Sequence, residues 1–211
     1  LSVRTRALSK SLDYQPYTQN KDVPMVQNAS RLLRRLNPYC AQALSAAATL
    51  CQSRAHGYIS IEHWLLKLFE QGEGDLTLIA RRYEWDLDAL WGGLLEHLDT
   101  LPRSVHAKPQ LCGKLQRLIS NAWLRASLDS QDHLRSAHLL GALLESPDLL
   151  ACETAWPLFS VSETQLQHLF ALLDQHSEER PQAQQAAAID QAQVLTGSAA
   201  VQRGGADEGE T

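Results

Sequence analysis

The sequence predicts an all-α domain made of a tandem repeat of two four-helix units, with one extra helix at its N-terminal side. Apolar residues through the middle of the chain recur at the three- and four-residue spacing of amphipathic helices. The second half repeats the first at a shift of 75 positions, as Leu36 and Leu111 illustrate. We find neither the apolar–polar alternation of strands nor an Asn-Gly hairpin, so no sheet is expected.

The chain begins with a stretch that we interpret as a flexible leader or extension, residues 1–24. It has no apolar core of signal-peptide length, and the only methionine of the chain is Met25. An extra helix is expected over 26–36. Its narrow apolar stripe consists of Val26, Ala29, Leu32, Leu33 and Leu36. Its other flanks carry Arg31, Arg34 and Arg35.

The first repeat is expected over about 37–100, as four helices whose starts carry capping residues. Asn37 followed by Pro38 is typical of a helix start, because Asn caps and Pro suits the first helical position. Ser60, Asp75 and Asp86 are expected to cap the next three helices. Each is followed by apolar residues at helical spacing. One unit of this size has little interior, so two units are expected to share a core.

The second repeat is expected over about 110–175 and follows the same plan. Its first helix matches that of the first repeat residue by residue at the 75-position shift, and His138 falls opposite His63. Further on the shift becomes 76, and Ser162 with Gln165 forms a capping box at the last helix start. Together with the extra helix, the two repeats define a domain over 25–175.

The remaining residues, 176–211, change in composition. They are rich in Gln, Ala, Gly and charged residues and contain almost no large apolar side chain. Such a segment buries too little surface to offset its conformational entropy, so it is interpreted as a flexible linker.

Composition excludes several functional classes. The formal net charge is −5, from 24 acidic and 19 basic residues, which argues against general nucleic-acid binding. The four cysteines lie far apart without a CxxC pair, so neither a metal site nor a disulfide framework is expected. No stretch approaches the apolar length of about 20 residues that a membrane span needs.

The repeated histidines, His63 and His138, raise the question of catalysis. A catalytic histidine needs a nucleophile or a carboxylate within hydrogen-bond reach, and the neighbour Glu62 points in another direction on a helix. Both histidines fall in the first turn of equivalent helices, just after Ser60 and Ser136, which we take as caps. We therefore expect them to fasten the helix starts, and we expect no catalytic residue in the chain.

The amino-acid sequences of both repeats resemble those of a known family. The stretch LNPYCAQALSAAATLCQSRAHGYISIEHWLLKLFEQGEGDL, followed later by RSAHLLGALLE, is similar to the N-terminal domain of the Clp family of AAA+ unfoldases. The resemblance covers about residues 36–174. Within that family the extra helix MVQNASRLLRRLNP and the first-repeat wording are most similar to the ClpV (TssH) ATPases of type VI secretion.

The resemblance implies a partner and a place of action. ClpV-type proteins bind an N-terminal helix of the large sheath subunit, VipB or TssC, in the contracted sheath in the cytoplasm. Their ATPase modules form a hexamer and disassemble the sheath. The nucleotide-binding string G-x-x-x-x-G-K-[ST] does not occur in these 211 residues, so no cofactor is expected here. ATP and Mg²⁺ are expected only in AAA+ modules that follow the linker.

The resemblance also favours a groove for the partner helix beside the extra helix. Apolar anchors in such a groove give affinity, and charges on its rim give orientation. One wall is expected from the extra helix and the other from the first helix of the first repeat. The expected groove residues are Val26, Ala29, Leu32, Leu33, Leu36, Ala43, Leu44 and Ala47.

Two other interpretations remain open from the sequence. The domain could serve a general Clp unfoldase or disaggregase that receives adaptors or unfolded clients. Alternatively, the extra helix could simply cover the end of the first repeat, and the chain could act as a free-standing helical-repeat regulator.

Overall fold

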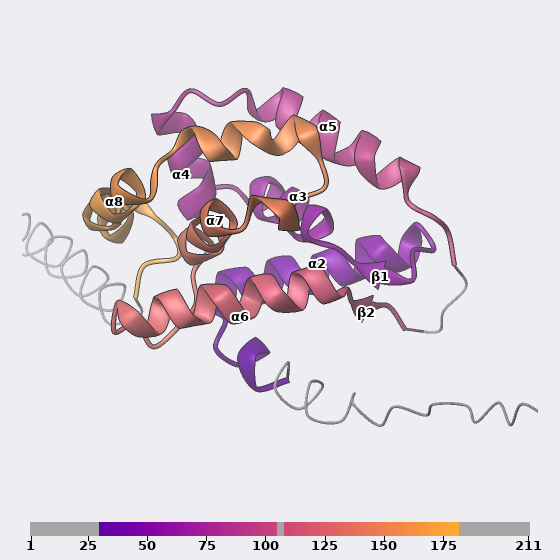
Figure 1. Cartoon of the computed structure of the whole chain (residues 1–211), viewed down its shortest axis with the longest axis horizontal. Coiled ribbons are helices and arrows are strands. Elements are labelled where there is room, and N and C mark those ends of the chain that lie inside the picture. The colour runs from indigo at the N-terminus through magenta and orange to yellow at the C-terminus, as the bar shows by residue number, and fades with distance from the viewer. Residues whose placement is uncertain (1–29, 105–107, 182–211) are drawn as a thin grey trace, which may run out of the picture.

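The structure is a computed structural model that describes residues 30–104 and 108–181, and in this part it is mainly helical (Figure 1). The first repeat contains α2 (Pro38–Ser53), β1 (Tyr58–Ile59), α3 (Ile61–Gln71), α4 (Asp75–Arg82) and α5 (Leu87–Thr100). The second contains β2 (Gln110–Leu111), α6 (Gly113–Leu128), α7 (Ser136–Glu145), the 3-10 segments η1 (Pro147–Leu149) and η2 (Glu153–Ser160), and α8 (Glu163–His176).

The predicted helix starts are confirmed where a side chain closes the first turn. The Asn37 side chain accepts from the Cys40 N–H at 2.7 Å, and Pro38 takes the first helical position. Asp86 caps α5 in the same way, and Ser162 with Gln165 forms the expected capping box on α8. These caps satisfy backbone donors that the first helical turn leaves without partners.

The repeated histidines fasten helix starts, as predicted. Nδ1 of His63 accepts the Ser60 N–H at 3.1 Å, and Nδ1 of His138 accepts the Arg135 N–H at 3.1 Å. One expectation is wrong: Arg135, not Ser136, precedes α7 as its N-cap. The 75-position shift places Arg135 opposite Ser60, so the structure follows the repeat rather than the residue type.

Asp75 does not cap α4, contrary to the sequence prediction. Gly74 holds the cap position and Asp75 is the first helical residue. The Asp75 carboxylate is fully buried and accepts from the Arg135 guanidinium at 2.8 and 2.9 Å. Arg135 also donates to Asp174 of α8. The capping role is lost because this carboxylate is needed as the partner of a buried arginine.

The two repeats have equivalent helix packing, and short extended segments of each pair with segments of the other. α2 packs on α3 as α6 packs on α7, while α4 contacts α7 across the two repeats. β1 and β2 pair in parallel with Ile59 opposite Leu111, and a second parallel bridge joins Leu36 to Leu134. The two pairings are equivalent under the 75-position shift, because Leu36 corresponds to Leu111 and Ile59 corresponds to Leu134. The expectation of no sheet is therefore corrected at these short pairings.

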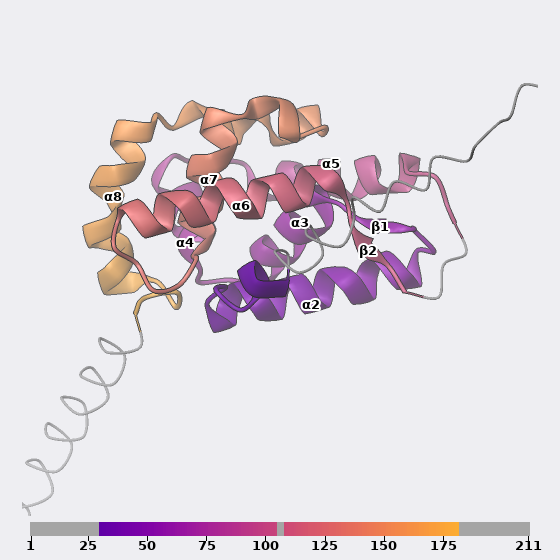
Figure 2. The same cartoon turned by 60° about the horizontal axis from the view of Figure 1, so that its bottom comes forward.

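The second repeat departs from a four-helix plan at its third position. Where the first repeat has the α-helix α4, the second has η1 and η2, and Pro157 lies inside η2. Proline has no N–H to donate, which disfavours a regular α-helix there. η2 packs against α5, which Figures 1 and 2 show on the side of the molecule away from α2.

The ends of the domain differ from the predicted boundaries. Residues 30–33 are helical, but 34–35 form a turn and Leu36 pairs with Leu134, so the expected helix over 26–36 ends earlier. Its start, including Val26 and Ala29, lies outside the described residues, as do 1–24 and 182–211. Residues just after α8 pack into the domain, because Ser177 and Glu179 are buried. The packed chain thus continues beyond the predicted end at 175.

Candidate docking groove

An apolar groove lies on the first repeat, with a volume of about 410 Å³. One side comes from the segment ahead of α2, one from the outer face of α2, and one from the paired strands. Figure 2 shows the helical residues 30–33 in front of the body of the domain, projecting between α2 and α6, and Leu33 of this turn lines the groove. The lining residues are Leu33, Leu36, Ala41, Leu44, Ser45, Ala48, Ile59, Pro109 and Leu111.

The sequence of α2 explains why the groove is open. The face of α2 toward the core carries Cys40, Ala43, Ala47 and Cys51, all with 0% exposure. Its adjoining face carries Ala41, Leu44, Ser45 and Ala48, which recur at helical spacing and line the groove. Small side chains on that face leave the backbone close to the surface, so a partner helix can approach α2 closely.

The structure brings together three of the predicted groove residues: Leu33, Leu36 and Leu44 line the groove. Leu32 is half-buried against the core instead. Ala43 and Ala47 are fully buried and face inward, so they support the groove from behind and do not line it. The wall on α2 is displaced from the predicted one by one or two residues, because the inner face carries the alanines that pack against α3. Val26 and Ala29 lie outside the described residues.

Sequence reasoning missed the residues from the neighbouring face of α2 and from the strands. Ala41, Ser45 and Ala48 had a signal in the sequence, because they are small residues at spacings of four and three. Ile59 and Leu111 had none, since a strand of two residues shows no alternation. Their position depends on pairing between segments far apart in the chain.

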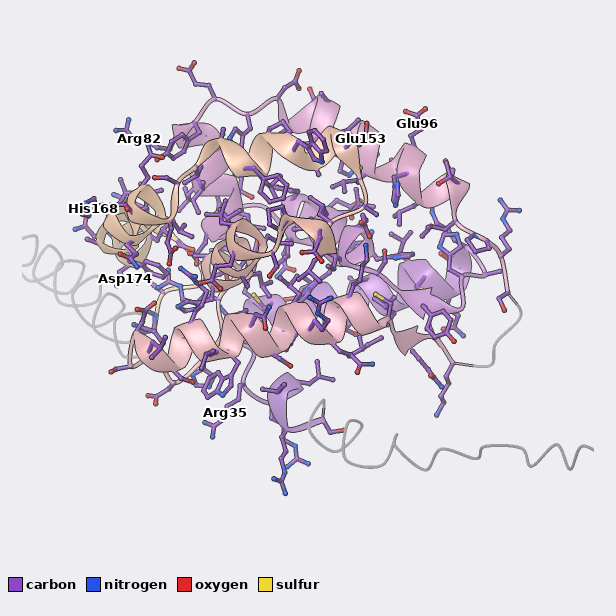
Figure 3. All side chains as sticks on the ribbon, viewed as in Figure 1. Arg35, Arg82, Glu96, Glu153, His168 and Asp174 are labelled. Carbon is purple, nitrogen blue, oxygen red and sulfur yellow. The ribbon has the colours of Figure 1, made fainter. Side chains whose placement is uncertain are left out.

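Exposed basic residues adjoin the groove residues Leu33 and Leu36 in the chain. Arg31, Arg34 and Arg35 are exposed beside Leu33, as expected for a rim. The Arg35 guanidinium lies 5.0 Å from the centre of the Trp123 ring, which fixes one of these charges beside α6 (Figure 3). A rim of this sign favours a partner with acidic residues next to its apolar face.

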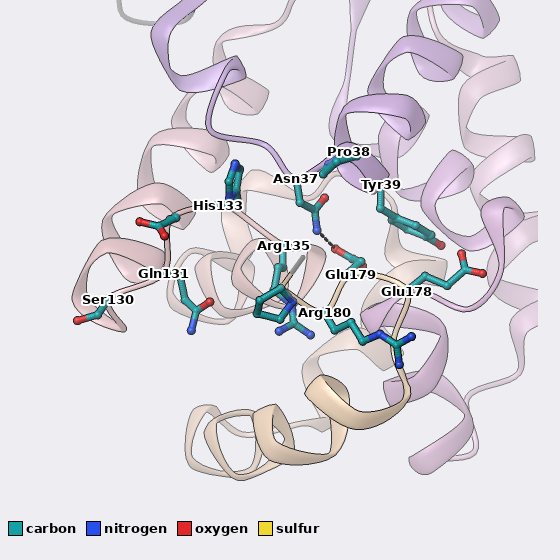
Figure 4. A pocket seen from close by; sticks show the side chains of 12 residues that line it. Asn37, Pro38, Tyr39, Ser130, Gln131, His133, Arg135, Glu178, Glu179 and Arg180 are labelled. Carbon is teal, nitrogen blue, oxygen red and sulfur yellow. Dashed lines mark hydrogen bonds between the residues drawn. The ribbon is translucent and has the colours of Figure 1, made fainter. Parts of the chain in front are cut away.

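A second cavity, of about 340 Å³, lies where the chain leaves α8 (Figure 4). It is bordered by the start of α2, by residues 130–133 and by 178–181. Its deepest polar groups, Arg135 and Glu179, are buried and hydrogen-bonded within the protein. Arg135 and Glu179 use their hydrogen bonds to join the two repeats, Arg135 to Asp75 and Glu179 to Asn37 and Ser136.

The histidines show no catalytic arrangement. Nδ1 of His63 receives the Ser60 N–H, and its Nε2 lies 2.9 Å from Nδ1 of His56. Burial and the neighbouring His56 lower the pKa of His63 to about 4, and burial together with Arg135 lowers the pKa of His138 to about 4. The Ser60 hydroxyl also lies 2.9 Å from Nδ1 of His63, and the two residues form a capping box at the start of α3.

The described residues offer neither a cluster of metal ligands nor a membrane-spanning helix. Among residues 30–104 and 108–181, no three His, Cys, Asp or Glu side chains converge as metal ligands would. The helices within these ranges are all too short or too polar to cross a bilayer.

Fold and groove together define a helical-repeat docking domain. The family model described as "Clp repeat (R) N-terminal domain" matches residues 35–154, and the chain belongs to this family. A curated relative, the chaperone protein ClpB of Yersinia enterocolitica, is 32% identical over 126 residues. That match covers 59% of this chain and only 14% of the relative's length.

Solved structures place the chain among the ClpV N-domains of this family. The N-terminal domain of the ClpV1 ATPase from the E. coli EAEC Sci1 type VI secretion system is 57% identical, with a TM-score of 0.73, over 75% of this chain and 98% of that one. A second match is a ClpV N-domain in complex with a VipB peptide. It is 27% identical, with a TM-score of 0.64, over 72% of this chain and 94% of that one.

Proposed function

We propose that this chain is the substrate-recognition domain of a ClpV-type AAA+ ATPase, and that its groove binds an N-terminal helix of a VipB- or TssC-like sheath subunit. The observation that carries the proposal is the apolar groove along the small-residue face of α2. The match to a ClpV N-domain solved with a VipB peptide supports a peptide as its occupant.

The groove suits a short amphipathic helix in both shape and charge. Leu33, Leu36 and Leu44 offer apolar contacts, while Ala41 and Ser45 leave room for a helix backbone to come close. The basic rim orients a helix that carries acidic residues at its edge. A contact of this small size is expected to be transient, with a dissociation constant on the order of micromolar.

The motor itself belongs to other modules under this proposal. The 211 residues contain no G-x-x-x-x-G-K-[ST] string, so ATP and Mg²⁺ would bind to AAA+ modules of a longer protein. Those modules would assemble the hexamer and pull on the sheath in the cytoplasm, while this domain selects the substrate. The chain spans a small part of the curated relative, as expected for one module of such a motor.

The test is a titration of the chain with a synthetic sheath-subunit N-terminal helix. Ser45→Trp places a large ring in the groove and should weaken binding at least tenfold, because the helix can no longer approach α2. The matched control is Ser120→Trp on α6, which is the position equivalent to Ser45 in the other repeat and is also exposed. Ser120→Trp should bind within twofold of the unaltered chain. Equal binding by both variants would show that the helix docks elsewhere.

The general Clp role remains the second candidate, and the match to ClpB favours it. In that case the domain would receive adaptors or unfolded clients rather than one defined helix. A parallel titration with an unfolded model protein separates the two functions. Binding of the unfolded protein without binding of the sheath helix would support the general role.

A further inference from the structure

The carboxylate of Glu179 is held by donors from three different helix starts. Its Oε1 accepts the Asp75 N–H at 2.9 Å and the Ser136 hydroxyl. Its Oε2 accepts the Ser136 N–H at 2.7 Å, Nδ2 of Asn37 at 3.0 Å and the Cys40 thiol at 3.3 Å. With 3% exposure, this carboxylate is an internal anchor of the fold.

The anchor joins both repeats to the segment by which the chain leaves α8. Asn37 and Asp75 begin α2 and α4 in the first repeat, and Ser136 begins α7 in the second. Backbone N–H groups at helix starts favour a negative charge, which explains why an acidic side chain fits there. The Glu178 N–H also donates to the Glu73 carbonyl at 3.0 Å, so backbone and side chain hold this segment together.

The same anchor lies next to the groove. Asn37, which donates to Glu179, directly follows Leu36, a groove residue (Figure 4). The Asn37 N–H donates to the Leu134 carbonyl at 3.0 Å, and the Leu134 N–H donates to the Arg35 carbonyl at 2.7 Å. The corner from Arg35 to Asn37 is thus held on one side by the second repeat and on the other by Glu179.

We propose that Glu179 is a positioning residue for the groove, and that it couples occupancy of the groove to the segment by which the chain leaves the domain. The inference rests on the proposed function, since the occupant is the sheath helix. By linkage, a helix that binds better when the corner is ordered also stabilises the Glu179 anchor, and to the same extent. Binding of the helix would then stabilise the segment that follows α8, without any contact between the helix and Glu179.

The experiment uses the full 211-residue chain and two readouts. Hydrogen exchange follows the Asp75 and Ser136 amides, whose N–H groups donate to Glu179. Titration with the sheath-subunit helix follows the groove. Glu179→Ala should speed exchange at both amides at least tenfold and weaken helix binding about fivefold or more, within the usual range of coupling between sites. The control Glu96→Ala removes an exposed carboxylate from α5, at a residue that is neither in the groove nor in the Glu179 anchor, and should change neither readout.

A milder variant tests the same link in case Glu179→Ala does not fold. Asn37→Ser keeps an oxygen that can cap α2 but removes the amide donor to Glu179, so it should reproduce the weaker binding in part. In the unaltered chain, added helix should also slow exchange of the Glu178 amide.

Each remaining outcome overturns a definite part of the inference. Unchanged exchange at Asp75 and Ser136 in Glu179→Ala would overturn the anchor. Fast exchange with helix binding within twofold of the unaltered chain would overturn the coupling. Failure of the unaltered chain to bind the helix would overturn the proposed function and with it the coupling, while the exchange readout would still decide the anchor.

Discussion

At the scale of single residues, the two buried carboxylates, Asp75 and Glu179, have different partners, and Glu179 makes the stability of the domain depend on pH. The Asp75 carboxylate forms an ion pair with the Arg135 guanidinium, which donates to it through two nitrogens. Within residues 30–104 and 108–181, the groups that donate to Glu179 are all neutral. Burial, and then the nearby charge of Asp75, raises the pKa of Glu179 to about 7. The folded protein therefore binds a proton at Glu179 more tightly than the unfolded chain does.

This shift predicts a pH dependence of stability with a definite sign. A raised pKa in the folded state gives stability that is complete below the unfolded value near 4.5 and is lost as the pH rises toward 7. His63 and His138, with lowered pKa values, act in the opposite direction over much of the same range. The comparison is therefore between the unaltered chain and Glu179→Gln, which cannot titrate.

Urea unfolding at a series of pH values measures this effect. Relative to Glu179→Gln, the unaltered chain should lose free energy of unfolding between about pH 4.5 and 7, where each unit of pKa difference is worth about 1.4 kcal/mol. A constant difference across this pH range would contradict the raised pKa.

The sequence predicted residue roles where the repeat made them visible. The histidine caps could be inferred because His63 and His138 occur at equivalent positions after a helix start. Glu179 could not, because it lies among polar residues and its partners are 43 to 142 positions away in the chain. Burial of such a residue depends on tertiary contacts that local composition does not reveal.

At the scale of elements, α5 of the first repeat and η2 of the second approach each other closely. A Cβ added to Gly93 would lie 2.1 Å from Oγ1 of Thr154, whereas one added to the adjacent Gly92 would meet nothing within 4 Å. Both glycines are in the same helix, so they share the same loss of helix propensity relative to alanine. They differ only in what the added methyl group would contact.

This pair gives a matched prediction. Gly93→Ala should lower the free energy of unfolding by about 1–3 kcal/mol, because it forces η2 away from α5. Gly92→Ala should raise it by up to about 1 kcal/mol, because it adds helix propensity on an open surface. Thermal or urea unfolding of the two variants measures both. Similar effects for both variants would show that α5 and η2 do not meet as closely as described.

The elements also show where sequence patterns stop being informative. Helices with several turns of apolar spacing and a capping residue, such as α2 and α8, were predicted close to their observed starts. The strands and η1 were missed, since two or three residues carry no periodicity. The eight residues of η2 depart from the expected α-helix, because they contain Pro157. One wall of the groove was displaced for a related reason: the inner and outer faces of α2 both carry alanine, so hydropathy alone does not distinguish them.

At the scale of the whole molecule, the two repeats depend on one another. Ile59 pairs with Leu111 and Leu36 with Leu134, so each repeat completes a strand pairing of the other. The fully buried Asp75 finds its cation, Arg135, across the same boundary. Removal of one member of a buried ion pair costs about 3–5 kcal/mol, because the other charge is left buried and unpaired. We therefore expect the two repeats to unfold as one cooperative unit.

The final prediction concerns the repeats as separate chains. Fragments 30–104 and 108–181 should each lack stable tertiary structure alone, since the first keeps Asp75 without Arg135 and the second keeps Arg135 without Asp75. Mixed in equal amounts, they should recover helical circular dichroism and cooperative unfolding, because every contact between the repeats is restored. Asp75→Ala in the first fragment should prevent this recovery, whereas Asp88→Ala, at a position outside the boundary on α5, should not. Cooperative unfolding of either fragment alone would show that its own core is enough for a stable fold. The strand pairings and the Asp75–Arg135 pair would then only orient two independent units.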